Sequence, residues 1–450
     1  MVSLRWFAVA FILWPVVQAI LITPAIDPFY QPPAGFASTA PGTILRSRPI
    51  VAANLGLIPI PVQATQLLYR TRSINGSAIA TVTTIFQPLD AQPNRFISFQ
   101  TAEDGAWINC APSYNFQLLD PATNPIVAFE LIIIQVYLAS GYTVVSSDYE
   151  GPDAAFGAGR LSGYGTLDGM RAATQFLGGS QAIVGAGYSG GAIATGWAAS
   201  LQPTYAPELD VKGWAMGGTP ANLTGTALFV SDTLFSGFLP PTLDGLNKPS
   251  SYLAQLQPLI NETITPYGQT ILDIANTNCA PTDIVAYAGQ SPLSFDFQSL
   301  GPALLQNPVF MSVLSQQTMG VNSNETPTAP VFLYHAVLDE IIPYANASTL
   351  FDSWCSKGAQ VTFATFEAGG HFTTEIGGVV PSIQYAASAF AGTTPSACTT
   401  ETMANPVVNP LALGLDAEPA LVELLNTLIK LGPNDENLFN NFATTGSIAA

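Results

Sequence analysis

One segment constrains the fold more than any other: a buried strand pattern runs into Gly-x-Ser-x-Gly and then into a helix pattern of small residues. It occupies residues 182–194, with Ser189 at its centre. A strand that reverses sharply into a helix strains the serine backbone, and Gly187 and Gly191 let neighbouring segments approach without a Cβ clash. This pattern is typical of a nucleophile elbow. It predicts that Ser189 Oγ stands above a sheet and that the Gly190 N–H points at a developing oxyanion.

A serine of this kind needs a general base and an acid, and on such sheets they follow in the chain order serine, acid, histidine. The chain has two histidines, His335 and His371. His335 ends an apolar strand pattern and is predicted to be a core residue, whereas His371 follows two glycines in a turn before a helix. Asp339 comes just after the strand at 331–335, where catalytic residues of open α/β sheets gather. We therefore predict Asp339 and His371 as partners of Ser189, with Glu340 or Asp352 as alternative acids.

Short β-branched runs alternate with longer helical patterns along the chain. This alternation predicts an α/β fold with a mostly parallel sheet covered by helices on both faces. The predicted strands are 95–100, 142–147, 182–186, 211–216, 331–335 and 361–366, and the predicted helices are 126–140, 164–177, 192–201 and 373–390. From 219 to 309 the strand signal fades, which indicates a mainly helical insertion over one end of the sheet.

Charge excludes one large class of partner. The chain has 12 Lys and Arg against 30 Asp and Glu, a formal net charge of -18. No basic run is present to neutralise a phosphate backbone, so nucleic acid is excluded as a partner. An anionic membrane surface would also repel this protein, and contact with lipid would have to be apolar.

The first nineteen residues read as a secretory signal peptide, with Arg5 before an apolar stretch and a cleavage site after Ala19. A membrane anchor is the alternative, but the stretch is shorter than the roughly 20 residues that a span requires. We therefore expect a secreted protein without a transmembrane anchor. Near the C-terminus, an apolar stripe at 419–429 indicates a helix that packs on the core or forms a lipid-facing flap.

If the protein is secreted, its cysteines can form disulfides and its asparagines can be glycosylated. Four cysteines in an oxidising compartment predict two disulfides, and spacing leaves all three pairings open: Cys110, Cys279, Cys355 and Cys398. With those thiols bonded and two histidines, ligands for a zinc site are lacking, so we expect no metal. Five Asn-x-Ser/Thr triplets are candidate glycosylation sites: Asn75, Asn222, Asn261, Asn324 and Asn346.

The elbow segment has a rival reading. Residues 185–190 also spell Gly-x-Gly-x-x-Gly after a strand, and Glu208 and Asp210 lie near the acidic position of a dinucleotide-binding fold. A secreted, acidic protein has little access to NAD, and this reading leaves Ser189 unexplained. We therefore favour the elbow and expect no cofactor.

Several ordered motifs resemble those of the fungal secretory lipases, and the resemblance covers most of the mature chain. The matching stretches are 103–104 with 110–114, 144–151, 187–191, 205–209, 217–220 and 335–344. The resemblance implies an α/β-hydrolase fold with an inserted lid, acting on acylglycerols and other esters at a lipid–water interface. It implies that Ser189 is the nucleophile, His371 the base and Asp339 the acid, with backbone oxyanion donors at Gly190 and Asp104.

The same resemblance implies that Cys110 pairs with Cys279 and Cys355 with Cys398. We expect a monomer with five segments: 1–19 signal peptide, 20–218 first part of the core, 219–309 lid, 310–400 second part of the core and 401–450 C-terminal extension or flap. The leading functional prediction is a triacylglycerol lipase. The alternatives are a carboxylesterase for small soluble esters, an inactive lipid-binding homologue, and a serine peptidase with the same constellation.

Overall fold

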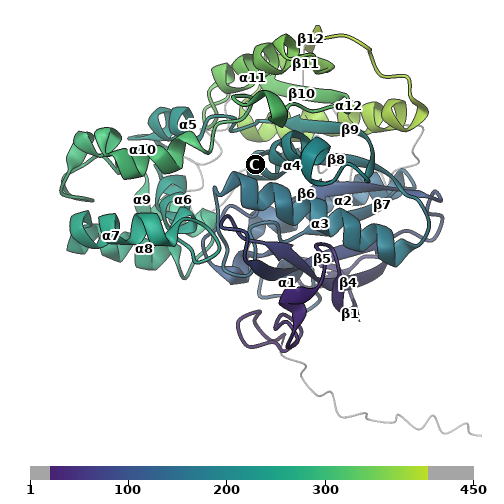
Figure 1. The fold of residues 1–450 in the computed structure, drawn as a ribbon, viewed down its shortest axis with the longest axis horizontal. Coiled ribbons are helices and arrows are strands. Elements are labelled where there is room, and N and C mark those ends of the chain that lie inside the picture. Colours follow the sequence, from purple (N-terminus) through teal and green to yellow (C-terminus); the bar gives the residue numbers. More distant parts are fainter. Residues whose placement is uncertain (1–20, 404–450) are drawn as a thin grey trace, which may run out of the picture.

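The computed structural model describes residues 21–403, and a ten-stranded sheet runs through this part of the chain (Figure 1). Its strands lie in the order β1 (Ile44–Ile50), β4 (Gln63–Arg72), β5 (Ala78–Gln87), β7 (Thr143–Ser147), β6 (Arg95–Gln100), β8 (Ala182–Tyr188), β9 (Asp210–Gly217), β10 (Val331–Ala336), β11 (Val361–Phe366) and β12 (Thr399–Met403). From β7 to β12 neighbouring strands are parallel, whereas β1, β4 and β5 pair antiparallel, and β5 pairs antiparallel with β7. The predicted mostly parallel sheet is confirmed.

Helices cover both faces of this sheet, as predicted. On one face lie α3 (Gly159–Leu177), α4 (Gly190–Tyr205) and α11 (Tyr344–Ser356), and on the other lie α2 (Pro125–Ala139) and α12 (His371–Ala391). Each face has its own core. Trp197, Trp214 and Trp354 are buried on the α3 and α4 face, and Tyr137 and Tyr334 are buried on the α2 and α12 face.

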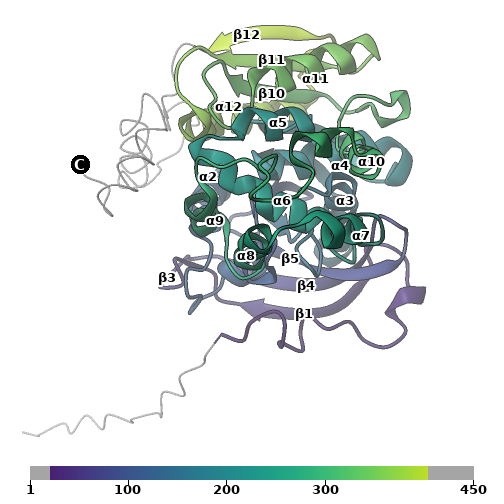
Figure 2. The ribbon, with the colours of Figure 1, turned by 90° about the vertical axis from the view of Figure 1, so that its left-hand side faces the viewer.

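Between β9 and β10 the chain leaves the sheet and forms helices, which we call the helical segment (residues 218–330). It contains α5 (Leu223–Val230), α6 (Leu239–Leu246), α7 (Leu253–Thr263), α8 (Pro266–Ala275), α9 (Ala280–Tyr287) and α10 (Pro308–Ser315). These helices gather on one side of the molecule (Figures 1 and 2) and pack around a further apolar core, which also includes Ala155, Ala158 and Leu161 around the start of α3. The insertion predicted for 219–309 lies within this segment, and its expected end falls inside α10.

Two disulfides fasten the fold. Cys110 is bonded to Cys279, which joins the loop region after β6 to the start of α9 in the helical segment. Cys355 is bonded to Cys398, which joins the end of α11 to the segment before β12. This is the pairing that the family resemblance implies.

Two predictions lie outside the described residues: the signal peptide at 1–19 and the apolar stripe at 419–429. Within residues 21–403, no helix combines the length and apolarity that a membrane crossing requires.

Candidate active site

Ser189 lies on the turn between β8 and α4, the position predicted for a nucleophile elbow. Its backbone has φ 52° and ψ -120°, a conformation that non-glycine residues rarely adopt and that is found at functional sites. Close packing requires glycine on both sides. A Cβ on Gly187 would lie 2.6 Å from the carbonyl oxygen of Gly191, and a Cβ on Gly191 would lie 1.9 Å from that of Gln100.

A chain of hydrogen bonds connects Ser189 to the two predicted partners. His371 Nε2 lies 2.8 Å from Ser189 Oγ, and His371 Nδ1 lies 2.7 Å from Asp339 Oδ2. His371 is the first residue of α12, and Asp339 lies in the turn after β10. The backbone N–H groups of Ile341 and Ile342 donate to Asp339 Oδ1 and hold the carboxylate in place. The arrangement can pass a proton from a serine hydroxyl to an oriented imidazole.

The electrostatics of the pair suit a base with an ionised partner. Burial alone raises the pKa of Asp339, but the charge and hydrogen bond of His371 offset it and lower that pKa below its ordinary value. Burial opposes the imidazolium of His371, yet Asp339, with Glu340 and Glu375 nearby, raises its pKa to about 9. Asp339 is therefore charged, and the basic form of His371 becomes more abundant as the pH rises.

The alternative acids are placed differently. Glu340 Oε2 accepts the backbone N–H of His371 at 3.1 Å, while Asp352 is exposed on α11. His335 is buried in β10, as predicted, but it also contacts the site: its Nε2 lies 3.0 Å from the carbonyl oxygen of Ile342 and 3.3 Å from Asp339 Oδ2. This contact was not predicted, although the spacing of four residues between His335 and Asp339 could have suggested it.

The two predicted oxyanion residues lie beside Ser189. Gly190 is the first residue of α4, so its N–H has no partner within the helix and adds to the positive end of the helix dipole. Asp104 and Gly190 line the same cavity as Ser189. The loop that carries Asp104 is held by Glu130 of α2, whose carboxyl oxygen Oε2 accepts the Ala102 N–H. This role of Glu130 was not predicted, although a single acidic residue in an otherwise apolar helix could have suggested it.

Two cavities open beside Ser189, and a third shares lining residues with one of them. The histidine-side cavity, about 270 Å³, is lined by Ser189, Asp104, His371 and apolar side chains of α2 and α9. The inner cavity, about 50 Å³, extends from Ser189 toward α5 and α6. The outer cavity, about 70 Å³, lies within the helical segment and shares four lining residues with the inner one: Leu223, Ala227, Leu239 and Thr242.

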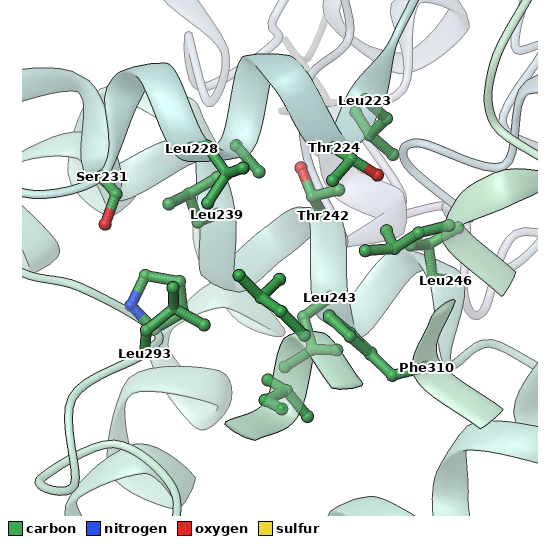
Figure 3. Close-up of a pocket in the computed structure, with 15 residues that line it drawn as sticks. Leu223, Thr224, Leu228, Ser231, Leu239, Thr242, Leu243, Leu246, Leu293 and Phe310 are labelled. Carbon is green, nitrogen blue, oxygen red and sulfur yellow. The ribbon is translucent and has the colours of Figure 1, made fainter. Parts of the chain in front are cut away.

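The outer cavity is almost entirely apolar. Leucines of α5 and α6 face the same space as Leu293 and Phe310 (Figure 3). The hydroxyl groups of Thr224, Ser231 and Thr242 are the polar exceptions among its lining side chains. The inner and outer cavities adjoin at their shared residues, so a mostly apolar lining extends from Ser189 into the helical segment.

The dinucleotide reading is wrong for this fold. Gly185 lies inside β8 rather than in a loop after it. Glu208 Oε1 accepts a hydrogen bond from Arg171, and Asp210 pairs with Lys212 at the start of β9, the opposite end of the sheet from Ser189. The acidic side chains therefore cannot reach a ligand bound at the end of β8.

Comparison with known proteins gives a consistent picture. Residues 117–397 match the model of the secretory lipase family. A secreted triacylglycerol lipase of Malassezia furfur is 37% identical over 430 residues, which cover 93% of this chain and 91% of that protein. Lipase 10 of Candida albicans is 37% identical over 396 residues, or 83% of this chain and 82% of that protein.

Among solved structures, Candida antarctica lipase A superposes with a TM-score of 0.82 at 33% identity, covering 91% of this chain and 96% of that chain. Its closed state superposes with a TM-score of 0.81 at 32% identity. The mostly parallel sheet with Ser189 at the end of β8 is therefore an α/β-hydrolase fold. From the match over most of its length, the chain belongs to the secretory lipase family.

Proposed function

We propose that this protein is a secreted lipase that hydrolyses acylglycerol esters through an acyl-enzyme on Ser189. The observation that carries the proposal is the continuous hydrogen-bonded chain from Ser189 through His371 to Asp339, placed where apolar cavities meet. The relatives named as secreted triacylglycerol lipases support the substrate class and the secreted location.

The proposed reaction has two steps. His371 Nε2 takes the proton of Ser189 as Oγ attacks the ester carbonyl, and the Gly190 N–H and Asp104 stabilise the oxyanion. The oxyanion collapses to an acyl-enzyme while His371 returns the proton to the leaving alcohol. His371 then activates a water molecule, which releases the fatty acid. Asp339 keeps the Nδ1 proton of His371 in place throughout and stabilises the imidazolium.

The cavities provide room for both parts of an acylglycerol. In our proposal the fatty acyl chain enters the inner and outer cavities, because their walls are apolar and begin beside Ser189. The glycerol part leaves on the side of His371, where the histidine-side cavity is larger. This orientation brings the leaving oxygen toward the imidazole that must protonate it.

We further propose that the helical segment is the lid that meets the lipid–water interface. Its surface exposes Leu228 and Phe229 on α5 and, farther along, Val285 and Phe295. With a formal net charge of -18, the protein is repelled electrostatically by an anionic lipid surface. These exposed apolar side chains are instead suited to binding a neutral acylglycerol surface. We propose that it acts as a monomer.

The test combines activity with active-site labelling. The secreted protein is assayed on emulsified trioleoylglycerol, on a soluble short-chain p-nitrophenyl ester and on a peptide anilide. We expect hydrolysis of the emulsion, with Ser189→Ala lowering kcat by about 10⁴-fold or more. A fluorophosphonate should label the wild type at Ser189 and leave Ser189→Ala unlabelled.

Each alternative gives a different result. Absence of labelling would indicate an inactive lipid-binding homologue. Hydrolysis of the soluble ester without any on the emulsion would indicate a carboxylesterase, and preferred cleavage of the anilide would indicate a peptidase.

A further inference from the structure

Two buried carboxyl groups contact each other on the α2 and α12 face of the sheet. Glu130 of α2 is 0% exposed, and Glu375 of α12 is 7% exposed. Their side chains are hydrogen-bonded to each other. The rings of Phe129 on α2 and Phe372 on α12 are also in contact, with their centroids 4.6 Å apart. The two carboxyl groups therefore meet where α2 packs against α12.

A hydrogen bond between two carboxyl groups requires a proton on one of them, because an ionised carboxylate can only accept hydrogen bonds. Glu130 already accepts the Ala102 N–H with Oε2, which leaves Oε1 to bond with Glu375. Burial raises the pKa of Glu130 well above its ordinary value, and the charge of Glu375 and the hydrogen bond to it raise that pKa further. The Ala102 N–H acts in the opposite direction. This balance favours Glu130 as the neutral acid and Glu375 as the carboxylate.

The carboxylate of this pair lies beside the histidine of the site. Glu375 follows His371 by four residues on α12, so the two side chains lie on the same face of the helix. Both residues line the histidine-side cavity. Burial opposes the imidazolium of His371, but the charges of Asp339, Glu340 and Glu375 outweigh it and raise the pKa of His371 to about 9. Glu375 thus contributes part of the charge that favours a protonated imidazole.

Several other titratable groups face the pair or the imidazole. They are Asp104 in the loop after β6, Tyr137 of α2, Tyr188 of β8, Tyr334 and His335 of β10, and Asp339 and Glu340 in the turn after β10. Burial raises the pKa values of Tyr137 and Tyr334, so both are neutral where histidine titrates. Burial raises the pKa of Asp104 to about 7 and lowers that of His335. Asp339 and Glu340 act on His371 in the same direction as Glu375, so a substitution of Glu375 itself is needed to isolate its share.

We propose that Glu130 and Glu375 form a shared-proton pair, in which neutral Glu130 donates its O–H to the Glu375 carboxylate and this carboxylate stabilises the imidazolium of His371 during the reaction. The inference rests on the proposed function and extends it. Glu375 acts through His371 and is a positioning residue. The proton of the pair stays on Glu130 while His371 takes and returns the serine proton, so no bond is made or broken at either carboxyl group. The same hydrogen bond ties α12, which begins at His371, to the loop that Glu130 holds at Ala102.

The experiment measures the pKa of His371 directly. The chain has two histidines, so NMR of protein labelled with ¹⁵N-histidine can follow the His371 imidazole across pH beside the buried His335. We expect Glu375→Gln to lower the pKa of His371 by about 0.5–1 pH unit, because a nearby negative charge is lost. Glu130→Gln should leave that pKa in place, since glutamine is uncharged like the neutral acid, donates to Glu375 and accepts the Ala102 N–H. On a soluble ester, the ascending limb of kcat/KM should move to lower pH in Glu375→Gln and stay in place in Glu130→Gln.

Asp120→Asn is the matched control for the loss of a buried carboxyl group. Burial raises the pKa of Asp120 to about 6, but Asp120 lines neither cavity at Ser189, so this variant should keep the wild-type pKa of His371. The inference is overturned if Glu130→Gln lowers that pKa as much as Glu375→Gln does, which would make Glu130 the ionised partner, or if Glu375→Gln leaves it in place. The NMR titration requires no turnover, so it tests the pair even if the wild type fails to react with a fluorophosphonate at Ser189, a result that would reject the proposed function instead.

Discussion

At the scale of single residues, the acid of the proposed triad is fixed by more than its histidine. Asp339 accepts two backbone N–H groups from Ile341 and Ile342, and His335 holds the same turn through the carbonyl oxygen of Ile342. Burial lowers the pKa of His335 even though Asp339 is close, so His335 is neutral and its Nε2–H can donate to that carbonyl. His335 is therefore a positioning residue for Asp339.

The first prediction concerns this support. His335→Phe fills the space but leaves the buried Ile342 carbonyl without a donor, which costs about 1–3 kcal/mol of unfolding free energy. We also expect a lower kcat, because the turn that carries Asp339 is less well fixed. His335→Gln retains an amide donor and should lose less of both. Urea unfolding and ester kinetics test this, and equal effects of the two substitutions would contradict a positioning role.

The second prediction concerns the five candidate glycosylation sites, which the fold separates into two groups. Asn75, Asn261 and Asn324 are exposed. Asn346 is buried, and its Nδ2 donates to Thr226 Oγ1 at 2.7 Å, while Asn222 is half-buried and caps α5. We expect glycans on the three exposed asparagines only. Mass spectrometry of peptides from the secreted, enzymatically deglycosylated protein tests this, and a glycan on Asn346 in active protein would contradict the packing described.

At the scale of elements, the sequence predicted the centre of the sheet but not its edges. Strand β10 is buried along its whole length, which gives the largely apolar run Val-Phe-Leu-Tyr-His-Ala that is easy to recognise. The antiparallel strands β4 and β5 have Gln, Thr and Ala at buried positions, so their apolar alternation is hidden. The outermost strand β12 is mostly exposed and polar and depends on backbone pairing with β11.

In the candidate site too, some features could be predicted from the sequence and others could not. The elbow motif and the small number of histidines were enough to single out Ser189, Asp339 and His371 as partners. The cavities could not be predicted, because they depend on how α5, α6 and α10 pack after long loops. The buried carboxyl groups around Asp104 were also missed, since hydropathy patterns give acidic residues no sign that they will be buried.

The third prediction belongs to helix α5. Ala227 lines both the inner and outer cavities, so the side chain of Ala227→Phe should fill the space where the two cavities adjoin. Keeping one methylene group of the acyl chain out of an apolar site costs about 0.8 kcal/mol of binding free energy. If the larger side chain excludes two methylene groups of an oleoyl chain, kcat/KM for oleoyl esters falls about tenfold relative to that for butanoyl esters. Leu228→Phe is the control, because Leu228 lines only the outer cavity and is half exposed. A chain-length profile tests this, and an unchanged ratio in Ala227→Phe would show that acyl chains do not take this route.

At the scale of the whole molecule, the active site depends on the joining of two parts. The sheet supplies Ser189, Asp339 and His371, while the helical segment supplies most of the walls of the inner and outer cavities. The Cys110–Cys279 disulfide joins these parts and lies close to the Asp104 loop, because a Cβ on Gly105 would be 2.9 Å from Cys110 Sγ. The Cys355–Cys398 disulfide lies at the far edge of the sheet, beside β11 and β12.

The fourth prediction follows from this difference in place. Replacing both Cys110 and Cys279 by alanine opens a loop of 169 residues, and replacing both Cys355 and Cys398 opens one of 43. Chain entropy predicts a loss of about 3–5 kcal/mol of stability for either pair, with the longer loop costing about 1 kcal/mol more. We expect loss of Cys110–Cys279 also to lower kcat of the folded protein, because the Asp104 loop loses its anchor, whereas loss of Cys355–Cys398 should lower stability alone. Calorimetry combined with kinetics well below each Tm tests this, and a normal kcat without Cys110–Cys279 would show that the loop is held by Glu130 and its other contacts.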